Sequence, residues 1–182
     1  YKIVNTVVKE RLGGFHSAKC VLYSVDFAQI EECQTAGDWE KSAEILSQIA
    51  VGLKQAGAEC IVICTNTMHK VADAVEKACG LPLLHIADAT AQELLEHQIG
   101  RVALLGTRYT MEQDFYKEKL VQKGLDVIIP YENQRERIND VIFSELCLGT
   151  ISEESKAYFL EVIADLAKRG AQGIILGCTE IG

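Results

Sequence analysis

Proline, tryptophan and methionine are scarce in this sequence, whose 182 residues include 2 Pro, 1 Trp and 2 Met. Scarce proline, with 48% apolar and 24% charged residues, excludes a proline-rich or largely disordered chain. Basic residues are in the minority too, since 18 Lys and Arg stand against 26 Asp and Glu, a net charge of −8. Because an acidic surface repels phosphate backbones, no nucleic-acid partner is expected.

The sequence also lacks an apolar run of the ~18 residues that a membrane helix needs, and no signal peptide is visible. We therefore expect no membrane partner. Cysteine is the exception to these low counts, with an odd number at irregular spacing: Cys20, Cys33, Cys60, Cys64, Cys79, Cys147 and Cys178. Such a set fits reduced thiols in the cytoplasm better than a disulfide framework.

Strand-like and helix-like segments alternate along the chain, which predicts an α/β fold built on parallel sheets. Short apolar runs predict strands at residues 20–25, 60–64, 83–86, 101–106, 125–130 and 173–177. Helical spacing of apolar residues predicts helices at 39–55, 68–79, 89–96, 111–123, 132–148 and 153–169.

An internal repeat indicates two related halves. Gly57–Thr65 and Gly170–Thr179 each run from a Gly-Ala turn through an aliphatic strand to a Cys-Thr pair. This repeat predicts two similar domains, 1–97 and 98–182, each a short parallel sheet flanked by helices. The chain opens on Tyr1 without an initiator methionine, so we expect the first domain to lack segments at its N- and C-terminal ends.

Both Cys-Thr pairs fall just past the end of a predicted strand, where open parallel sheets bind ligands. If the halves face each other, Cys64 and Cys178 lie on opposite walls of an interdomain cleft. An enzyme that inverts a stereocentre without redox chemistry needs an acid/base group on each face of the carbon, and thiols can serve as both. The other five cysteines are expected only to pack, as free cysteines usually do.

Polar residues after each cysteine suit a carboxylate ligand. Thr65, Asn66 and Thr67 follow Cys64 at the start of a predicted helix, and Thr179 follows Cys178. The loop from Gly106 is interpreted as lining the same cleft.

A metal site and a hydrolase are less well supported. Cys60 and Cys64 are four residues apart, about 13 Å along a strand, too far to share a zinc ion. His69 could pair with a nucleophilic cysteine, although a helix residue at the cleft rim is the simpler interpretation. No lysine or glycine pattern indicates a bound prosthetic group, so no cofactor is expected.

The segments Cys64–His69 and Leu176–Ile181 resemble the two signature motifs of the aspartate/glutamate racemase family. The resemblance extends to Ser24–Phe27 and Gly106–Thr110. It implies an amino-acid racemase that needs no pyridoxal phosphate and has two α/β domains, commonly as a homodimer. It implies that Cys64 and Cys178 are the acid/base pair. It also implies that Thr65, Asn66 and Thr179 help to hold the substrate's carboxylate and amino group.

Two alternatives stay open: a related isomerase or decarboxylase of a small carboxylic acid, and a non-catalytic protein that binds small acids. The resemblance also bears on the substrate, since family members that act on aspartate or glutamate place basic residues in two loops. The matching stretches here, Asp26–Cys33 and Glu145–Gly149, contain no Arg or Lys. A neutral or broad amino-acid preference is therefore expected, with Arg135, Arg137 or Lys156 as other possible sources of a cation.

Overall fold

The computed structural model describes the whole chain, Tyr1–Gly182, as two compact units. The first comprises Tyr1–Ile61 and Asp73–Pro82, and the second comprises Val62–Ala72 and Leu83–Gly182. These limits differ from the predicted division between residues 97 and 98. The helix that precedes this point, Ile86–Glu96, belongs to the second unit because its buried Ala87 and Ala91 pack against the sheet of that unit.

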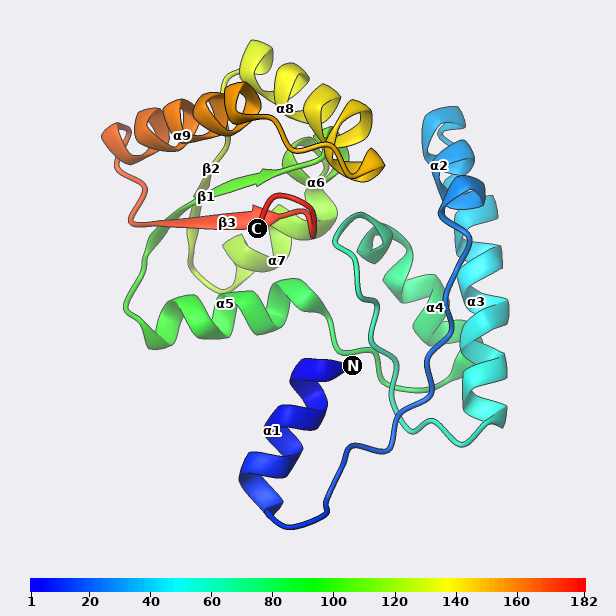
Figure 1. Cartoon of the computed structure of the whole chain (residues 1–182). Helices are drawn as coiled ribbons and strands as arrows, with labels where there is room; N and C mark the ends of the chain where they lie inside the picture. The colour runs from blue at the N-terminus through cyan, green and yellow to red at the C-terminus, as the bar shows by residue number, and fades with distance from the viewer. The chain divides into compact units, whose positions relative to one another are not determined.

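Helices make up the regular structure of the first unit (Figure 1): α1 (Lys2–Leu12), α2 (Phe27–Ala36), α3 (Trp39–Gln55) and α4 (Ala72–Cys79, its first residue in the second unit). The side chain of Asp38 caps α3 by accepting a hydrogen bond from the backbone N–H of Lys41 (2.9 Å). Lys54 ties α3 to the end of α4 by donating to the carbonyl of Cys79 (2.7 Å).

The strands predicted at 20–25, 60–64 and 83–86 do not form a sheet. Residues 20–25 are extended without a ladder, and Ile61 forms a single bridge, its N–H donating to the carbonyl of Pro82 (2.9 Å). Ile86 instead starts a helix, because His85 accepts a hydrogen bond from the N–H of Ala87 and caps it. An apolar run becomes a strand only where a neighbour satisfies its backbone groups along its length, and in these segments the pairing is limited to the single bridge at Ile61.

A parallel sheet forms the centre of the second unit (Figure 1). Its strands are β1 (Arg101–Gly106), β2 (Asp126–Ile128) and β3 (Gly173–Gly177), in the order β2-β1-β3. Gly106 pairs with Gly177, so β1 and β3 end side by side at the same edge. The mixed α/β class and the small parallel sheet flanked by helices agree with the sequence prediction.

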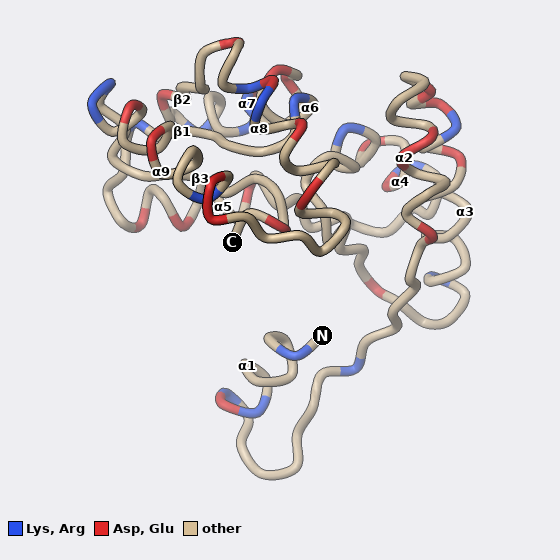
Figure 2. The backbone as a smooth tube through the Cα atoms, turned by 45° about the horizontal axis from the view of Figure 1, so that its top comes forward, with Lys and Arg blue, Asp and Glu red and all other residues tan.

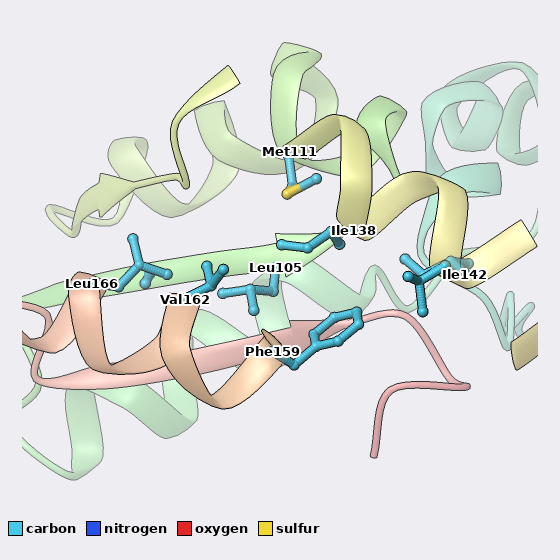
Figure 3. Packing of buried hydrophobic residues seen from close by; sticks show 9 residues of the cluster. Leu105, Met111, Ile138, Ile142, Phe159, Val162 and Leu166 are labelled. Carbon is cyan, nitrogen blue, oxygen red and sulfur yellow. The ribbon is translucent and has the colours of Figure 1, made fainter. Parts of the chain in front are cut away.

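Helices cover both faces of this sheet: α5 (Ile86–Glu96), α6 (Arg108–Glu112), α7 (Asp114–Gln122), α8 (Glu132–Ser144) and α9 (Glu153–Lys168), with short 3-10 helices η1 (Thr67–Val71) and η2 (Leu146–Leu148). On one face, Leu105 lies between Ile138 of α8 and Val162 of α9 (Figure 3). On the other, Leu104 packs with Ala87 of α5 and residues of α7.

Because β1 is covered on both sides, it forms a continuous buried run from Val102 to Gly106. Burying each large aliphatic side chain stabilises the fold by about 1.5–3 kcal/mol, so this central strand holds the carboxyl edge of the sheet in place. Acidic and basic residues are interspersed along the surrounding helices (Figure 2). No helix of the chain is both long and apolar enough to cross a membrane.

Candidate active site

Cys64 lies in the irregular segment between Ile61 and η1, and its side chain is exposed. Thr65 is exposed too, whereas Asn66 and Thr67 are buried at the start of η1. The segment therefore presents its thiol to solvent while the residues that follow anchor it to the second unit, to which all of them belong.

His69 is one of these anchors. Its Nδ1 lies 2.7 Å from the carbonyl oxygen of Thr65, and its Nε2 lies 3.2 Å from the backbone nitrogen of Ile86. Since a carbonyl only accepts and a backbone N–H only donates, Nδ1 carries the proton and the ring is neutral. Burial lowers the pKa of His69 despite the hydrogen bond to Thr65, which agrees with a neutral ring. With both nitrogens engaged, His69 is not available to activate a cysteine, so the hydrolase interpretation loses its base.

Cys178 lies in the turn that follows β3 and is partly buried. Its thiol donates a hydrogen bond to Oε2 of Glu180 (3.0 Å), which also accepts from the hydroxyl of Thr179 (2.7 Å). Burial, and then the Glu180 carboxylate, raise the pKa of Cys178 to about 12. Burial alone would raise the pKa of Glu180, but hydrogen bonds from Thr179 and Cys178 hold it below its ordinary value. Cys178 is therefore a protonated thiol at neutral pH.

Three buried threonine hydroxyls link the Cys64 segment to the sheet. Oγ1 of Thr67 lies 3.1 Å from Oγ1 of Thr107 and 3.4 Å from Oγ1 of Thr110, and the last two are 3.2 Å apart. Thr107 also accepts from the backbone N–H of Thr110 (3.4 Å), as the N-cap of α6. We call Thr67, Thr107 and Thr110 the threonine triad.

The triad lies at the carboxyl edge of the sheet, next to the end of β3 that precedes Cys178. Thr107 directly follows Gly106, whose register partner is Gly177, so Thr107 and Cys178 both follow the ends of adjacent parallel strands. A side chain placed on Gly177 would lie 3.2 Å from Cγ2 of Thr110. Cys64 is three residues from Thr67, a span of at most ~11 Å. Both cysteine-bearing segments are thus fixed to one edge of the sheet.

The triad should also contribute to stability. Thr110→Val keeps the shape of the side chain but leaves the buried hydroxyls of Thr67 and Thr107 with one partner fewer, which costs about 1–3 kcal/mol. We expect urea unfolding to show a loss in this range for Thr110→Val, but almost none for the matched exposed change Thr150→Val. The double variant Thr67→Val/Thr110→Val should lose less than the two single losses added together. Strictly additive losses would contradict a coupled network.

Cys64, Cys178 and the residues beside them stay predictions of the sequence as site residues, and sequence reasoning missed three features of this edge. It treated Thr107 only as part of a cleft-lining loop, did not foresee the triad, and did not foresee the contact of Glu180 with Cys178. The spacing of Thr107 and Thr110, an N-cap and its third following residue, was the available signal. No group of three or more His, Cys, Asp or Glu side chains is placed to hold a metal ion.

The family model for Asp/Glu/hydantoin racemase matches residues 1–182. The chain belongs to this family. Among solved structures of the racemase family, it resembles a candidate Asp/Glu racemase from Yersinia pestis, with 58% identity, a TM-score of 0.91, and coverage of 100% of this chain and 79% of that one. An aspartate racemase homologue from Pyrococcus horikoshii is 35% identical, with a TM-score of 0.79 and the same coverage.

A curated racemase of Bacillus subtilis, the broad specificity amino-acid racemase RacX, is 24% identical over 144 residues. That match spans 79% of this chain and 62% of RacX, so the chain corresponds to less than two thirds of that relative's length. Family membership confirms the resemblance drawn from the two Cys-Thr motifs.

Proposed function

We propose that this racemase-family chain interconverts amino-acid enantiomers without a cofactor, with Cys64 and Cys178 as acid and base on opposite faces of the α-carbon. The observation that carries the proposal is that both cysteine-bearing segments are fixed to one edge of the sheet, Cys178 by the end of β3 and Cys64 through the threonine triad. Such placement is what proton transfer to either face of a small substrate needs.

Each turnover moves two protons and no electrons. One cysteine, as thiolate, takes the α-proton of the bound amino acid and becomes a thiol, leaving a carbanion at the α-carbon. The other cysteine, as thiol, donates its proton to the opposite face and becomes a thiolate. The product has the inverted configuration, and proton exchange with solvent restores the starting pair. General acid/base catalysis of this kind contributes roughly 100- to 10,000-fold to a rate.

We further propose that Thr65, Asn66, Thr67 and Thr179 position the substrate. Thr65 and Thr179 are exposed beside the two thiols and offer hydroxyls to the substrate's carboxylate and amino group. Asn66 and Thr67 are buried, and the hydroxyl of Thr67 is engaged in the triad. These two residues therefore position the substrate indirectly, by holding the segment that carries Cys64 and Thr65.

The decisive experiment follows a single enantiomer in deuterated buffer with the full-length protein. Loss of the circular dichroism signal, with one deuterium gained in the product of opposite configuration, would support racemisation. Release of carbon dioxide would indicate the decarboxylase alternative, and saturable binding without exchange would indicate a binding protein. The proposal predicts undiminished activity in EDTA without added pyridoxal phosphate. Activity that depends on either addition would contradict it.

For the substrate, we propose a neutral or broad preference. Two basic residues that could have paired with an acidic side chain have partners of their own: Arg135 contacts Glu112 (2.8 Å) and Arg137 contacts Glu154 (3.3 Å). A buried unpaired carboxylate is costly, so an acidic substrate needs a free cation. The description of the relative RacX as broad in specificity supports the same proposal.

Arg108 provides the test of this preference. It directly follows Thr107, is exposed and has no ion-pair partner. We expect kcat/KM for aspartate and glutamate to stay within tenfold of that for serine, methionine or homoserine. A tenfold preference, about 1.4 kcal/mol of transition-state binding, for an acidic substrate would contradict the proposal. Loss of that preference in Arg108→Gln would then identify Arg108 as the missing cation.

We also propose a homodimer in the cytoplasm. All seven cysteines are free thiols, which fits a reducing compartment. Sedimentation equilibrium of the full-length protein measures the oligomeric state directly.

A further inference from the structure

We infer that Glu180 keeps Cys178 protonated, so that Cys178 is the proton donor of the cysteine pair in the resting protein. The role of Cys178 as proton donor rests on the proposed function, whereas the contact between Cys178 and Glu180 does not depend on it. The thiol donates to Oε2 of Glu180 at 3.0 Å, well inside the range for a hydrogen bond from sulfur.

The geometry favours the thiol over the thiolate. A carboxylate oxygen that accepts from S–H is stabilising while the proton stays on sulfur, and becomes a like charge at contact distance once the proton leaves. The hydroxyl of Thr179 donates to the same Oε2 at 2.7 Å and so helps to keep that oxygen in its charged, accepting form. Glu180 is thus held in place to oppose ionisation of Cys178.

Few other groups bear on this thiol. Cys147 of η2 is the other titratable group that acts on Cys178, and its own pKa is raised, first by burial and then by Glu180. Cys147 is therefore also a neutral thiol at neutral pH. No basic side chain offsets the carboxylate, because Glu180 forms no ion pair with Lys or Arg.

A consequence follows for the reaction. A two-base racemase is active only while its cysteine pair holds one proton, so its rate rises as the first thiol ionises and falls as the second does. If Cys178 is the thiol that Glu180 keeps protonated, the alkaline limb of the rate profile reports Cys178. Glu180 acts through Cys178 and not on the substrate, so it is a positioning residue rather than a catalytic one.

The test measures alkylation of Cys178 by iodoacetamide as a function of pH, with mass spectrometry to resolve each cysteine. Glu180→Gln and Glu180→Ala both remove the charge, and either should move the midpoint for Cys178 down by at least about one pH unit, a tenfold faster reaction on the rising limb. Glu180→Asp should keep much of the wild-type midpoint. Cys20, exposed in the first unit, is the internal control, and Glu118→Gln, at an exposed position of α7, is the matched variant.

An unchanged midpoint for Cys178 in both Glu180→Gln and Glu180→Ala overturns the inference, whether or not the protein racemises amino acids. Where it does, the alkaline limb of kcat/KM should move down by the same amount as the alkylation midpoint. A limb that stays in place while the midpoint moves would overturn the role of Cys178 as donor. Failure of the proposed function alone would abolish the rate profile and leave the alkylation shift intact.

Discussion

Cys64→Ser and Cys178→Ser are each expected to lower the racemisation rate by roughly 100- to 10,000-fold. Serine preserves the size of the side chain, but its hydroxyl is far too weak an acid to ionise near neutral pH or to take the place of a thiolate. The rate of approach to the racemate, followed by circular dichroism from each enantiomer, measures the loss.

The remaining thiol gives this prediction a sharper form. In deuterated solvent, Cys178→Ser should still exchange the α-proton of one enantiomer, because Cys64 remains as the base on that face. Cys64→Ser should exchange the opposite enantiomer more slowly and faster as the pH rises, because Cys178 is held as a thiol at neutral pH. The two variants should exchange opposite enantiomers, and that reciprocity distinguishes a two-base mechanism from a general loss of fold. Cys20→Ser, at an exposed thiol outside the second unit, is the control and should retain full activity. Racemisation near the wild-type rate in Cys64→Ser or Cys178→Ser would contradict the mechanism.

The second half of the fold could be predicted from the sequence because its patterns are satisfied locally. The apolar run at 101–106 is buried on both faces, and β1 has the predicted limits. The strand at 173–177 matches its prediction as well, and so does the helix at 39–55 in the first unit. In each case the period of apolar residues reflects the burial that the element meets.

The first half shows where that reasoning fails. The runs at 20–25 and 60–64 have strand-like composition, but composition does not supply a neighbouring strand. Likewise, the Cys-Thr motifs are local patterns from which two candidate thiols can be predicted, whereas the contact between Thr67 and Thr107 joins residues 40 positions apart. The partner of Cys178 was missed for a different reason: the orientation of Glu180 depends on a turn two residues long, which no periodicity describes.

Gly177→Ala is expected to be the most damaging substitution that leaves both thiols in place. A Cβ at this position would lie 2.8 Å from the carbonyl oxygen of Leu105, a backbone atom of the neighbouring strand that cannot swing away. Overpacking of this kind costs about 1–3 kcal/mol. Since Cys178 is the next residue, separating β3 from β1 also displaces its thiol, and a shift of ~1 Å can cost roughly 100-fold in rate.

Gly52→Ala is the matched control, because Gly52 lies within α3 with nothing within 4 Å of an added Cβ. Alanine there should stabilise the protein by about 0.5–1 kcal/mol through better helix propensity and leave the rate unchanged. Urea unfolding and racemisation, measured on both variants, separate the two effects. Because a Cβ added at Gly106 would lie equally close, 2.8 Å, to the carbonyl oxygen of Gly177, Gly106→Ala should reproduce the loss of stability. A fully active Gly177→Ala would mean that the end of β3 does not set the position of Cys178, and the proton-transfer geometry would then have to arise from the turn alone.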